Sequence, residues 1–537
     1  MPKKKVKRSP KRRSKGSKRK AAKKTSSKEA SEDKARSKGK TTVIDTYRFK
    51  SMNIPVTVNI TKTKDDYVPI YNVDVAAISD NTRVILEKIR EELIRAVNLG
   101  MVDLRDARRS GVIESRFSET IQKLIKKYFP DASEEESNFM TTYLIQRSLG
   151  MGSLEILNDD AFLEEIVINN AKDPVWVYHK KHGWLKTNID VKDEAQTKHY
   201  AVTIGRKVGR QLSVLEPLLD AHLAEGDRVN ATLFPVSTDG NTITIRRFSR
   251  DPWTITNFIE HNTMSTNAAA LIWMGIQYEL SAIIAGGTAS GKTSTLNVLA
   301  NFFPPNQRII SIEDTRELQL PKFLHWVPMS TRLPNVEGKG EIAMGDLLVN
   351  SLRMRPDRIL VGEVRRKREA ETLFEAIHTG HSCYATFHAN DARETLNRFT
   401  NPPIDVPKTL MPAISMIIIQ FRNRRTGMRR TFQVAEILPD STANVLMQYD
   451  PKKDILGNKN KSKSLFQTLE LFTGNTPNEI KKDIAEKELV LKYLVKNQIK
   501  DINDVGRLMA EYYTNKDNIM KYVRSNKHFF KKGNADA

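Results

Sequence analysis

Apolar side chains recur at two different spacings along this chain, and the change of spacing divides the chain into regions. From Thr82 to Leu99, and again from Phe117 to Phe129, they recur every three or four positions, and Glu134 to Leu149 continues this pattern. Such a period is typical of amphipathic helices. Residues 43–150 are therefore predicted to form a small, mainly helical N-terminal region.

Short strands are predicted to dominate the next region. Between Leu154 and Arg250 the chain has brief apolar runs, IVIN, VWVYH and TITIRRF, separated by Asn, Asp and Gly, with one helical stretch near residues 198–212. Runs of this kind, bounded by turn-forming residues, predict strands. We expect an α+β domain over residues 151–255, with Asp251-Pro252 and the polar HNTMSTN at 261–267 as the hinge to the next domain.

From Ala268 to about Gln420, strand-like runs of β-branched residues alternate with helical segments. This alternation predicts a mostly parallel sheet with helices on both faces. Further on, Thr476-Pro477-Asn478-Glu479 has the pattern of a capping box with proline at the first helical position. We therefore expect an α/β core over residues 256–450 and a helical C-terminal extension over residues 451–537.

The net charge of +23 is concentrated at one end of the chain. Residues 1–40 carry 19 Lys and Arg against 3 Asp and Glu, which leaves a net charge of only +7 for the other 497 residues. A segment so poor in apolar side chains cannot bury enough surface to offset the entropy of ordering it, so residues 1–42 are predicted to be a disordered basic arm. The arm is either a solubilising tail or an electrostatic anchor on anionic lipid or RNA.

Two further features indicate a soluble intracellular protein. Cys383 is the single cysteine, which excludes an internal disulfide framework. No apolar run approaches the ~18 residues that span a bilayer.

A glycine-rich loop gives the strongest chemical signal. The apolar run Ser281 to Ala285 leads into GGTASGKT and then a helical segment, which matches G-x-x-x-x-G-K-S/T in its strand-loop-helix context. A dinucleotide fingerprint needs G-x-G-x-x-G and no lysine, and a purely structural turn is the other alternative. The predicted nucleotide-binding residues are Gly286, Gly287, Thr288, Ala289, Ser290, Gly291, Lys292, Thr293 and Ser294. Lys292 is expected to reach the β- and γ-phosphates of ATP, and the Thr293 hydroxyl to ligate Mg²⁺.

Carboxylates come directly after two predicted strands of the same sheet. The strand Ile309–Ile312 ends at Glu313, and the strand Ile359–Val361 ends in Gly362-Glu363. Acidic groups at the carboxyl ends of parallel strands lie in the crevice where ligands bind. We expect Glu363 to orient or deprotonate an attacking water and Glu313 to polarise it from the other side. Surface carboxylates at strand ends are the alternative.

The segment AIHTGHSCYATFHAN, residues 376–390, holds His378, His381, His388 and Cys383, a possible set of zinc ligands. Residues 382–387 are predicted to be a strand, along which side chains alternate between faces, and His378 precedes a turn. Convergence of all four on one ion is therefore not expected. Cys383 is interpreted as a small buried residue.

Four motifs in order, GGTASGKT, IEDTREL, RPDRILVGEVR and TGHSCYATFHAN, resemble the secretion-type hexameric ATPases of type II and type IV secretion, type IV pili and the archaellum. In that family they are the Walker A, Asp box, Walker B and His box. The resemblance covers roughly residues 150–450 and implies a RecA-like P-loop ATPase core behind an α+β domain. The stretches VWVYHKKHGW, EGDRVN, TITIRRF, SLRMRPDRI and FQVAEI resemble the archaeal branch, whose members drive archaellum or pilus assembly.

The resemblance also implies roles for particular residues. Glu363 would be catalytic, although its strand lacks the Asp that many P-loop enzymes place there for Mg²⁺. His381 and His388 would lie near the nucleotide and report its γ-phosphate to the subunit interface. Arg228 and Arg246 would reach the phosphates from the N-terminal domain, where opposite charge stabilises the transition state; pairing with a strand-end carboxylate is the alternative for each.

Together with these motifs, the resemblance implies a homohexameric Mg-ATP-hydrolysing motor that acts on a polytopic membrane platform protein from the cytoplasmic face of the membrane. A nucleic-acid-dependent ATPase, such as a helicase or packaging motor, is the competing class, suggested by the P-loop and the basic arm. The near-neutral body and the lack of a recognisable nucleic-acid module disfavour it. A nucleotide-dependent scaffold without turnover is disfavoured by Glu363.

Overall fold

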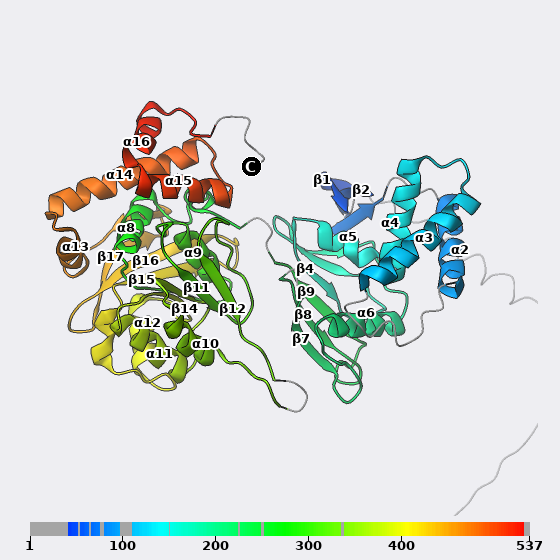
Figure 1. Cartoon of the computed structure of the whole chain (residues 1–537), viewed down its shortest axis with the longest axis horizontal. Coiled ribbons are helices and arrows are strands. Elements are labelled where there is room, and N and C mark those ends of the chain that lie inside the picture. Colours follow the sequence, from blue (N-terminus) through cyan, green and yellow to red (C-terminus); the bar gives the residue numbers. More distant parts are fainter. Residues whose placement is uncertain are drawn as a thin grey trace, which may run out of the picture. The chain divides into compact units, whose positions relative to one another are not determined.

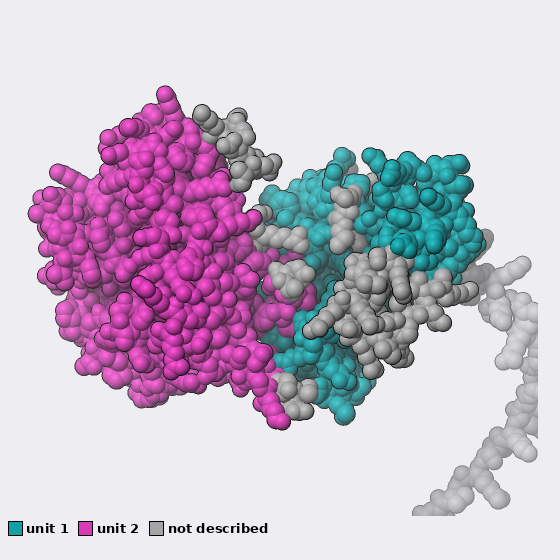
Figure 2. Space-filling model, viewed as in Figure 1, with its two compact units in different colours: residues 1–220, 229–246 teal, residues 221–228, 247–537 magenta. Residues whose placement is uncertain are grey.

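The computed structural model describes residues 41–51, 54–63, 66–75, 80–96, 110–149, 151–223, 226–248, 252–334 and 338–530. Almost all of the predicted basic arm lies outside these residues. The chain forms two compact units, residues 1–220 with 229–246 and residues 221–228 with 247–537 (Figure 2). The division falls after Arg246, earlier than the predicted boundary at 255, because Ile255 is buried in the core of the second unit.

The first unit is built on a nine-stranded sheet with the order β1-β2-β3-β6-β5-β4-β9-β8-β7 (Figure 1). The strands are β1 (Thr42–Ser51), β2 (Ile54–Lys62), β3 (Ile70–Asp74), β4 (Leu163–Ile168), β5 (Trp176–His179), β6 (Gly183–Thr187), β7 (Leu218–His222), β8 (Arg228–Thr232) and β9 (Thr242–Arg246). The helices are α2 (Asp80–Ala96), α3 (Ser110–Tyr128), α4 (Glu134–Leu149), α5 (Ser153–Asp159) and α6 (Glu194–Lys207).

The region that was predicted to be mainly helical also contributes three strands. Helices α2, α3 and α4 lie where the period of three to four predicted them. Ahead of them, Ile54, Val56, Val58 and Ile60 in β2 are almost fully buried, and they alternate with more exposed residues. This two-residue period is typical of a strand with one buried face. Through β3, which pairs with β6, β2 belongs to the same sheet as the strands of the following domain.

The second unit contains the predicted parallel sheet. Its order is β12-β11-β13-β14-β10-β15-β16-β17-β18, with parallel pairing from β12 to β15 and antiparallel pairing from β15 to β18. The strands are β10 (Ala282–Gly286), β11 (Ile309–Glu313), β12 (Trp326–Ser330), β13 (Arg358–Val361), β14 (Ser382–Phe387), β15 (Met416–Arg422), β16 (Arg429–Ile437), β17 (Ala443–Asp450) and β18 (Ile455–Asn458).

Both faces of this sheet are covered, as the alternation of strands and helices predicted. In β10, Ala282 and Ile284 belong to one buried cluster, whereas Ile283 and Ala285 belong to another. The helices and 3₁₀ turns of the core are α7 (Ile255–Glu260), α8 (Thr266–Gln277), α9 (Lys292–Ala300), α10 (Met344–Ser351), η3 (Leu352–Met354), α11 (Lys367–His378), α12 (Ala392–Thr400) and η4 (Lys408–Ala413). Because every strand in the middle of the sheet is buried on both faces, ligands can reach it only at its edges.

The C-terminal extension shares a hydrophobic core with the sheet. It consists of α13 (Leu465–Thr473), α14 (Pro477–Lys496), α15 (Ile502–Thr514) and α16 (Lys516–Ser525). Leu491 and Leu508 belong to the same buried cluster as Trp273 of α8. The indole N–H of Trp273 donates to the Tyr513 hydroxyl at 2.7 Å, and its ring stacks on Phe302 with centroids 5.3 Å apart.

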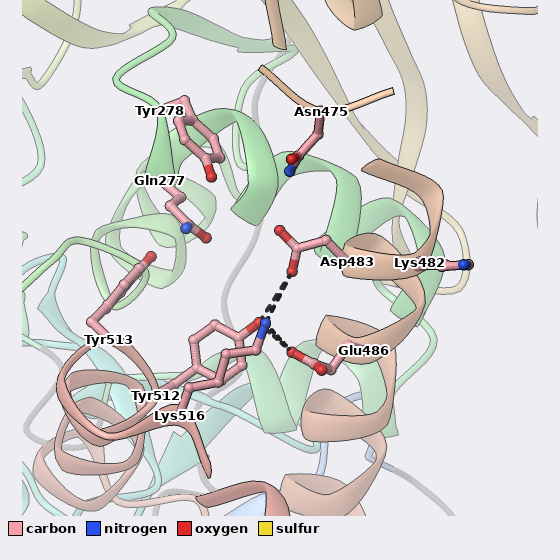
Figure 3. Close-up of a pocket in the computed structure, with 9 residues that line it drawn as sticks. All are labelled: Gln277, Tyr278, Asn475, Lys482, Asp483, Glu486, Tyr512, Tyr513 and Lys516. Carbon is pink, nitrogen blue, oxygen red and sulfur yellow. Dashed lines mark hydrogen bonds and ion pairs between the residues drawn. The ribbon is translucent and has the colours of Figure 1, made fainter. Parts of the chain in front are cut away.

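A polar cavity of about 490 Å³ lies between the end of α8 and helices α14 to α16 (Figure 3). On one wall Lys516 lies 2.5 Å from Glu486, and beside it the fully buried Lys487 lies 2.9 Å from Asp483. Two lysines thus neutralise the two carboxylates. Since α8 leads into the amino end of β10, this cavity lies at the sheet edge opposite the glycine-rich loop.

Candidate nucleotide site

The glycine-rich loop joins the end of β10 to the start of α9, as predicted. A side chain at Gly286 is excluded, because a Cβ there would lie 2.4 Å from the Ser290 hydroxyl and 2.5 Å from the Gln420 carbonyl oxygen. Gly291 has φ 98° and Ala289 has φ 58°, both in the left-handed region. These turns curl the loop around the N-terminus of α9, where free N–H groups and the helix dipole favour a phosphate.

The loop lysine points back into the loop. Lys292 is buried, and its amine lies 3.2 Å from the Gly287 carbonyl oxygen and 3.3 Å from His388 Nε2. Burial lowers the pKa of Lys292 from its ordinary value. The Thr293 side chain, half-buried at the start of α9, offers the hydroxyl oxygen that Mg²⁺ prefers as a ligand.

The chain of contacts continues from His388 to the end of β13. His388 Nε2 lies 2.8 Å from Glu363 Oε1, and the other Glu363 oxygen accepts a hydrogen bond from Arg365 at 2.5 Å. Arg365 also lies 2.8 Å from Asp314. Burial, with the Lys292 cation as the next cause, lowers the pKa of His388.

Sheet topology explains why these side chains meet. Strands β10, β14, β13 and β11 are neighbours in the sheet and run parallel, so their carboxyl ends lie at one edge. The residues at or within two positions of these ends include the P-loop, His388, Glu363 and Asp314. Neither Arg365 nor Asp314 was predicted to take part. The sequence could have suggested both residues, because each lies within two positions of a carboxylate that was predicted to be in the site.

Glu313 differs from Glu363 in its surroundings. Its side chain is 1% exposed, one carboxyl oxygen accepts the N–H groups of Glu317 and Leu318 at 2.9 and 3.0 Å, and the other is buried without a partner among the described residues. Burial raises its pKa to about 7. Gly362 allows this close packing, because a Cβ there would lie 3.3 Å from the Glu313 Cα. Glu313 thus shapes the loop after β11 and holds an exchangeable proton near neutral pH.

The two predicted sensor histidines lie at opposite ends of β14. His388 comes after its carboxyl end and contacts Lys292, whereas His381 precedes its amino end and lies 3.2 Å from the Ala376 carbonyl oxygen. Seven residue steps along the extended strand separate their Cα atoms by about 23 Å at ~3.3 Å a step. Within this unit the structure therefore does not bring His381 to the P-loop, contrary to the expectation that both histidines lie there.

The same geometry separates the possible zinc ligands. His378 is exposed at the end of α11, and Cys383 is 1% exposed within the core, as predicted for a small buried residue. Burial raises the pKa of its thiol strongly. Among the described residues no three His, Cys, Asp or Glu side chains are grouped as metal ligands.

The two arginines predicted to reach the phosphates are solvent-exposed on neighbouring strands, Arg228 at the start of β8 and Arg246 at the end of β9. Arg246 lies opposite Glu165 in the backbone register of β9 and β4. Burial raises the pKa of Glu165, and the Arg246 cation acts in the opposite direction. Contact of either arginine with a nucleotide stays a prediction.

The chain is similar to several known proteins. The family described as type II/IV secretion system protein matches residues 155–427. The uncharacterized protein MJ0900 of Methanocaldococcus jannaschii is 32% identical over 413 residues, 74% of each chain. The putative conjugal transfer protein Rv3659c of Mycobacterium tuberculosis is 32% identical over 300 residues, 53% of this chain and 84% of that protein. The pilus retraction motor PilT with bound ADP is 18% identical with a TM-score of 0.40, covering 63% of this chain and 92% of that chain.

The fold and the site define a P-loop ATPase with a mostly parallel sheet in its core, an α+β domain before it and a helical C-terminal extension. The chain belongs to the type II/IV secretion system protein family and is an ATPase.

Proposed function

We propose that this chain hydrolyses Mg-ATP as a homohexameric ring and powers assembly, and in an archaellum also rotation, of an archaellum or archaeal type IV pilus-like filament. It would act on a polytopic membrane platform protein from the cytoplasmic face. One observation carries the proposal: the contacts from Lys292 through His388 to Glu363 connect the phosphate loop to the end of the Walker B strand. Among the described residues no helix is long and apolar enough to cross a membrane.

The phosphate loop supplies binding and orientation. The N–H groups at the start of α9 face a β-phosphate, and Lys292, now resting on the Gly287 carbonyl, is close enough to turn to the β- and γ-phosphates. Thr293 would hold Mg²⁺, which neutralises charge on the phosphate oxygens when bound. Arg228 and Arg246 are proposed to add positive charge from the preceding domain.

The carboxylates supply the proton chemistry. Glu363 lies at the open edge of the sheet between His388 and Arg365, where its carboxylate can orient a water and take its proton. We propose that Glu313, whose burial raises its pKa to about 7, polarises the same water from the other side.

His388 couples the two parts of the site. It contacts both Lys292 and Glu363, so a γ-phosphate that draws Lys292 away changes the surroundings of His388, and phosphate release restores them. We propose that this exchange biases domain closure in the ring, a switch of the rigid-body kind. In this proposal His381, at the other edge of the sheet, passes the change to the neighbouring subunit.

Two substitutions test the chemistry. Glu363→Gln is expected to leave ATP binding within about threefold of wild type and to lower kcat by about 10²-fold or more, because an amide cannot accept a proton. Lys292→Ala is expected to abolish turnover, because the loop loses its cation. ATP hydrolysis and equilibrium nucleotide binding are the measurements. Loss of binding in Glu363→Gln would assign that residue a structural role, and near-normal turnover in Lys292→Ala would refute the P-loop assignment.

The biological role has a separate test. Disrupting this gene in its host is expected to remove surface filaments, seen by electron microscopy, and a catalytically dead Glu363→Gln copy is expected not to restore them. The competing nucleic-acid-dependent motor predicts stimulation of ATP hydrolysis by DNA or RNA. The filament motor predicts stimulation by anionic vesicles or by its platform protein instead.

A further inference from the structure

The hairpin between β15 and β16 carries a cluster of arginines that has no role in the nucleotide site as derived so far. It lies at the carboxyl edge of the sheet, because β15 runs parallel to β10 with Gln420 opposite Gly286, the first residue of the P-loop. The chain therefore leaves β15 and re-enters β16 beside that loop. The arginines are Arg422, Arg424, Arg425, Arg429 and Arg430.

Arg429 is the member of this cluster that contacts the P-loop. Its Nε–H donates to the Ala289 carbonyl oxygen at 3.1 Å, and its Cδ lies 3.7 Å from where a Cβ of Gly291 would stand. Among the described residues, neither of its terminal η-nitrogens has a hydrogen bond or an ion pair. The adjacent Arg430, in contrast, is engaged with Asp454 at 2.7 and 2.8 Å and has a structural role.

The order of the strands gives the direction of a bound nucleotide. The groups proposed to act on the γ-phosphate, His388 and Glu363, come after β14 and β13, on one side of β10. The P-loop and the start of α9 come after β10 itself and take the middle of the phosphate chain. A triphosphate with its γ end toward β13 must therefore direct its nucleoside end to the other side of β10. That side is formed by β15 and β16.

We infer that Arg429 is a nucleotide-binding residue that holds the P-loop through its Nε–H and contacts the nucleoside end of the nucleotide through its free η-nitrogens and its planar face. A guanidinium suits both tasks, because it has donors in a rigid fork and stacks on flat rings. The inference rests on the proposed function, since it requires that the P-loop binds a nucleotide.

The test compares a ligand with a nucleoside and one without. Binding of ADP and of inorganic pyrophosphate, each with Mg²⁺, is measured by isothermal titration calorimetry for wild type and Arg429→Gln. Both ligands place a diphosphate on the P-loop, and neither is turned over by an ATPase. Arg429→Gln is expected to weaken ADP binding about tenfold, the effect of losing a charged contact, and to change pyrophosphate binding no more than about twofold.

Arg425→Gln is the matched control, because it removes the same charge from an exposed position of the same hairpin without a side-chain contact to the P-loop. It is expected to bind both ligands as wild type does. In ATP hydrolysis, Arg429→Gln is expected to raise KM about tenfold and to leave kcat within about threefold of wild type.

Three results would overturn the inference. Equal weakening of ADP and pyrophosphate would show that Arg429 only holds the loop in shape. Unchanged binding of both ligands would show that Arg429 neither holds the loop nor contacts the nucleoside. If Arg425→Gln weakened ADP binding as much as Arg429→Gln does, the effect would come from the loss of positive charge on the hairpin and not from a contact of Arg429. A wild-type protein that binds neither ligand would instead remove the proposed function, and that failure is seen without any substitution at Arg429.

Discussion

Glu436 offers a stringent test of how the C-terminal extension is attached to the ATPase core. Its side chain, at the end of β16, is fully buried and accepts hydrogen bonds from the segment that opens α13. One oxygen takes the N–H of Lys463 and the amide of Asn444, and the other takes the N–H groups of Ser464 and Leu465 and the Ser462 hydroxyl. These five bonds measure 2.7, 2.6, 3.1, 2.7 and 2.7 Å, in that order.

Glu436→Gln keeps the shape of the side chain and removes half of its accepting capacity. Whichever way the amide turns, its NH₂ group faces at least two of the five donors, which then lose their acceptor in a buried place. Each such loss costs ~1–3 kcal/mol, so the substitution is expected to destabilise the fold by about 4 kcal/mol. For a unit of this size that corresponds to a decrease in Tm of about 8 °C at ~2 °C per kcal/mol.

Differential scanning calorimetry measures this decrease, and Glu479→Gln is the control. Glu479 also accepts an N–H and a hydroxyl at a helix N-terminus, both from Thr476 at 2.8 Å, but that carboxylate is exposed to solvent. Its substitution is therefore expected to have a much smaller effect. If the two substitutions lowered Tm equally, buried hydrogen bonding at Glu436 would not be what attaches α13 to β16.

The pH dependence of stability provides a second readout. Burial by itself raises the pKa of Glu436, but the N–H groups of Leu465 and Lys463 outweigh it and hold the pKa below the ordinary value of 4.5. A carboxyl with a lowered pKa stabilises the fold fully above its unfolded pKa, and this contribution is lost as pH falls through the folded pKa. Wild type should therefore lose more stability below pH ~4.5 than Glu436→Gln, whose amide does not titrate.

Two further predictions concern the histidines and the basic arm. His388→Ala is expected to lower the kcat of ATP hydrolysis about tenfold or more with little change in ATP affinity. For His381→Ala, kcat should stay within about threefold of wild type, because of the two histidines only His388 contacts Lys292 and Glu363. Equal effects in turnover assays would contradict the separation of the two along β14. Deletion of residues 1–40, which carry a net charge of +16, should weaken cosedimentation with anionic vesicles, more visibly at low salt, and leave basal ATP hydrolysis unchanged. A lower Tm of the truncated protein would argue against a disordered arm.

The sheet that carries the P-loop was largely predictable, because its signals are local. The predicted strand 382–387 coincides with β14, and the strands before the P-loop and at Glu313 and Glu363 are within one residue of β10, β11 and β13. The capping box at Thr476 is also confirmed. The Thr476 hydroxyl oxygen accepts the backbone N–H of Glu479, and the Glu479 carboxylate accepts the backbone N–H of Thr476. Helix caps and the spacing of apolar residues depend on residues that are close together in the sequence, so they can be recognised from one sequence alone.

The features that could not be predicted depend on contacts between distant segments. The attachment of Glu436 to Leu465 spans 29 residues, and the contact of Arg429 with Ala289 spans 140. The strand β12, WVPMS, contains a proline and no clear alternation, and it is ordered by its pairing with β11. Glu313 could be placed at the end of its strand, but its burial and raised pKa come from packing under Gly362.

The shared core of α8 and α14 has a mechanical consequence. Helix α14 packs on α8, and only four residues connect α8 to β10, which ends in the P-loop. Trp273 and the buried Lys487 tie these helices together, with the lysine amine 5.4 Å from the centre of the indole ring. A force applied to the C-terminal helices therefore reaches the phosphate loop through packed helices and a connection of only four residues.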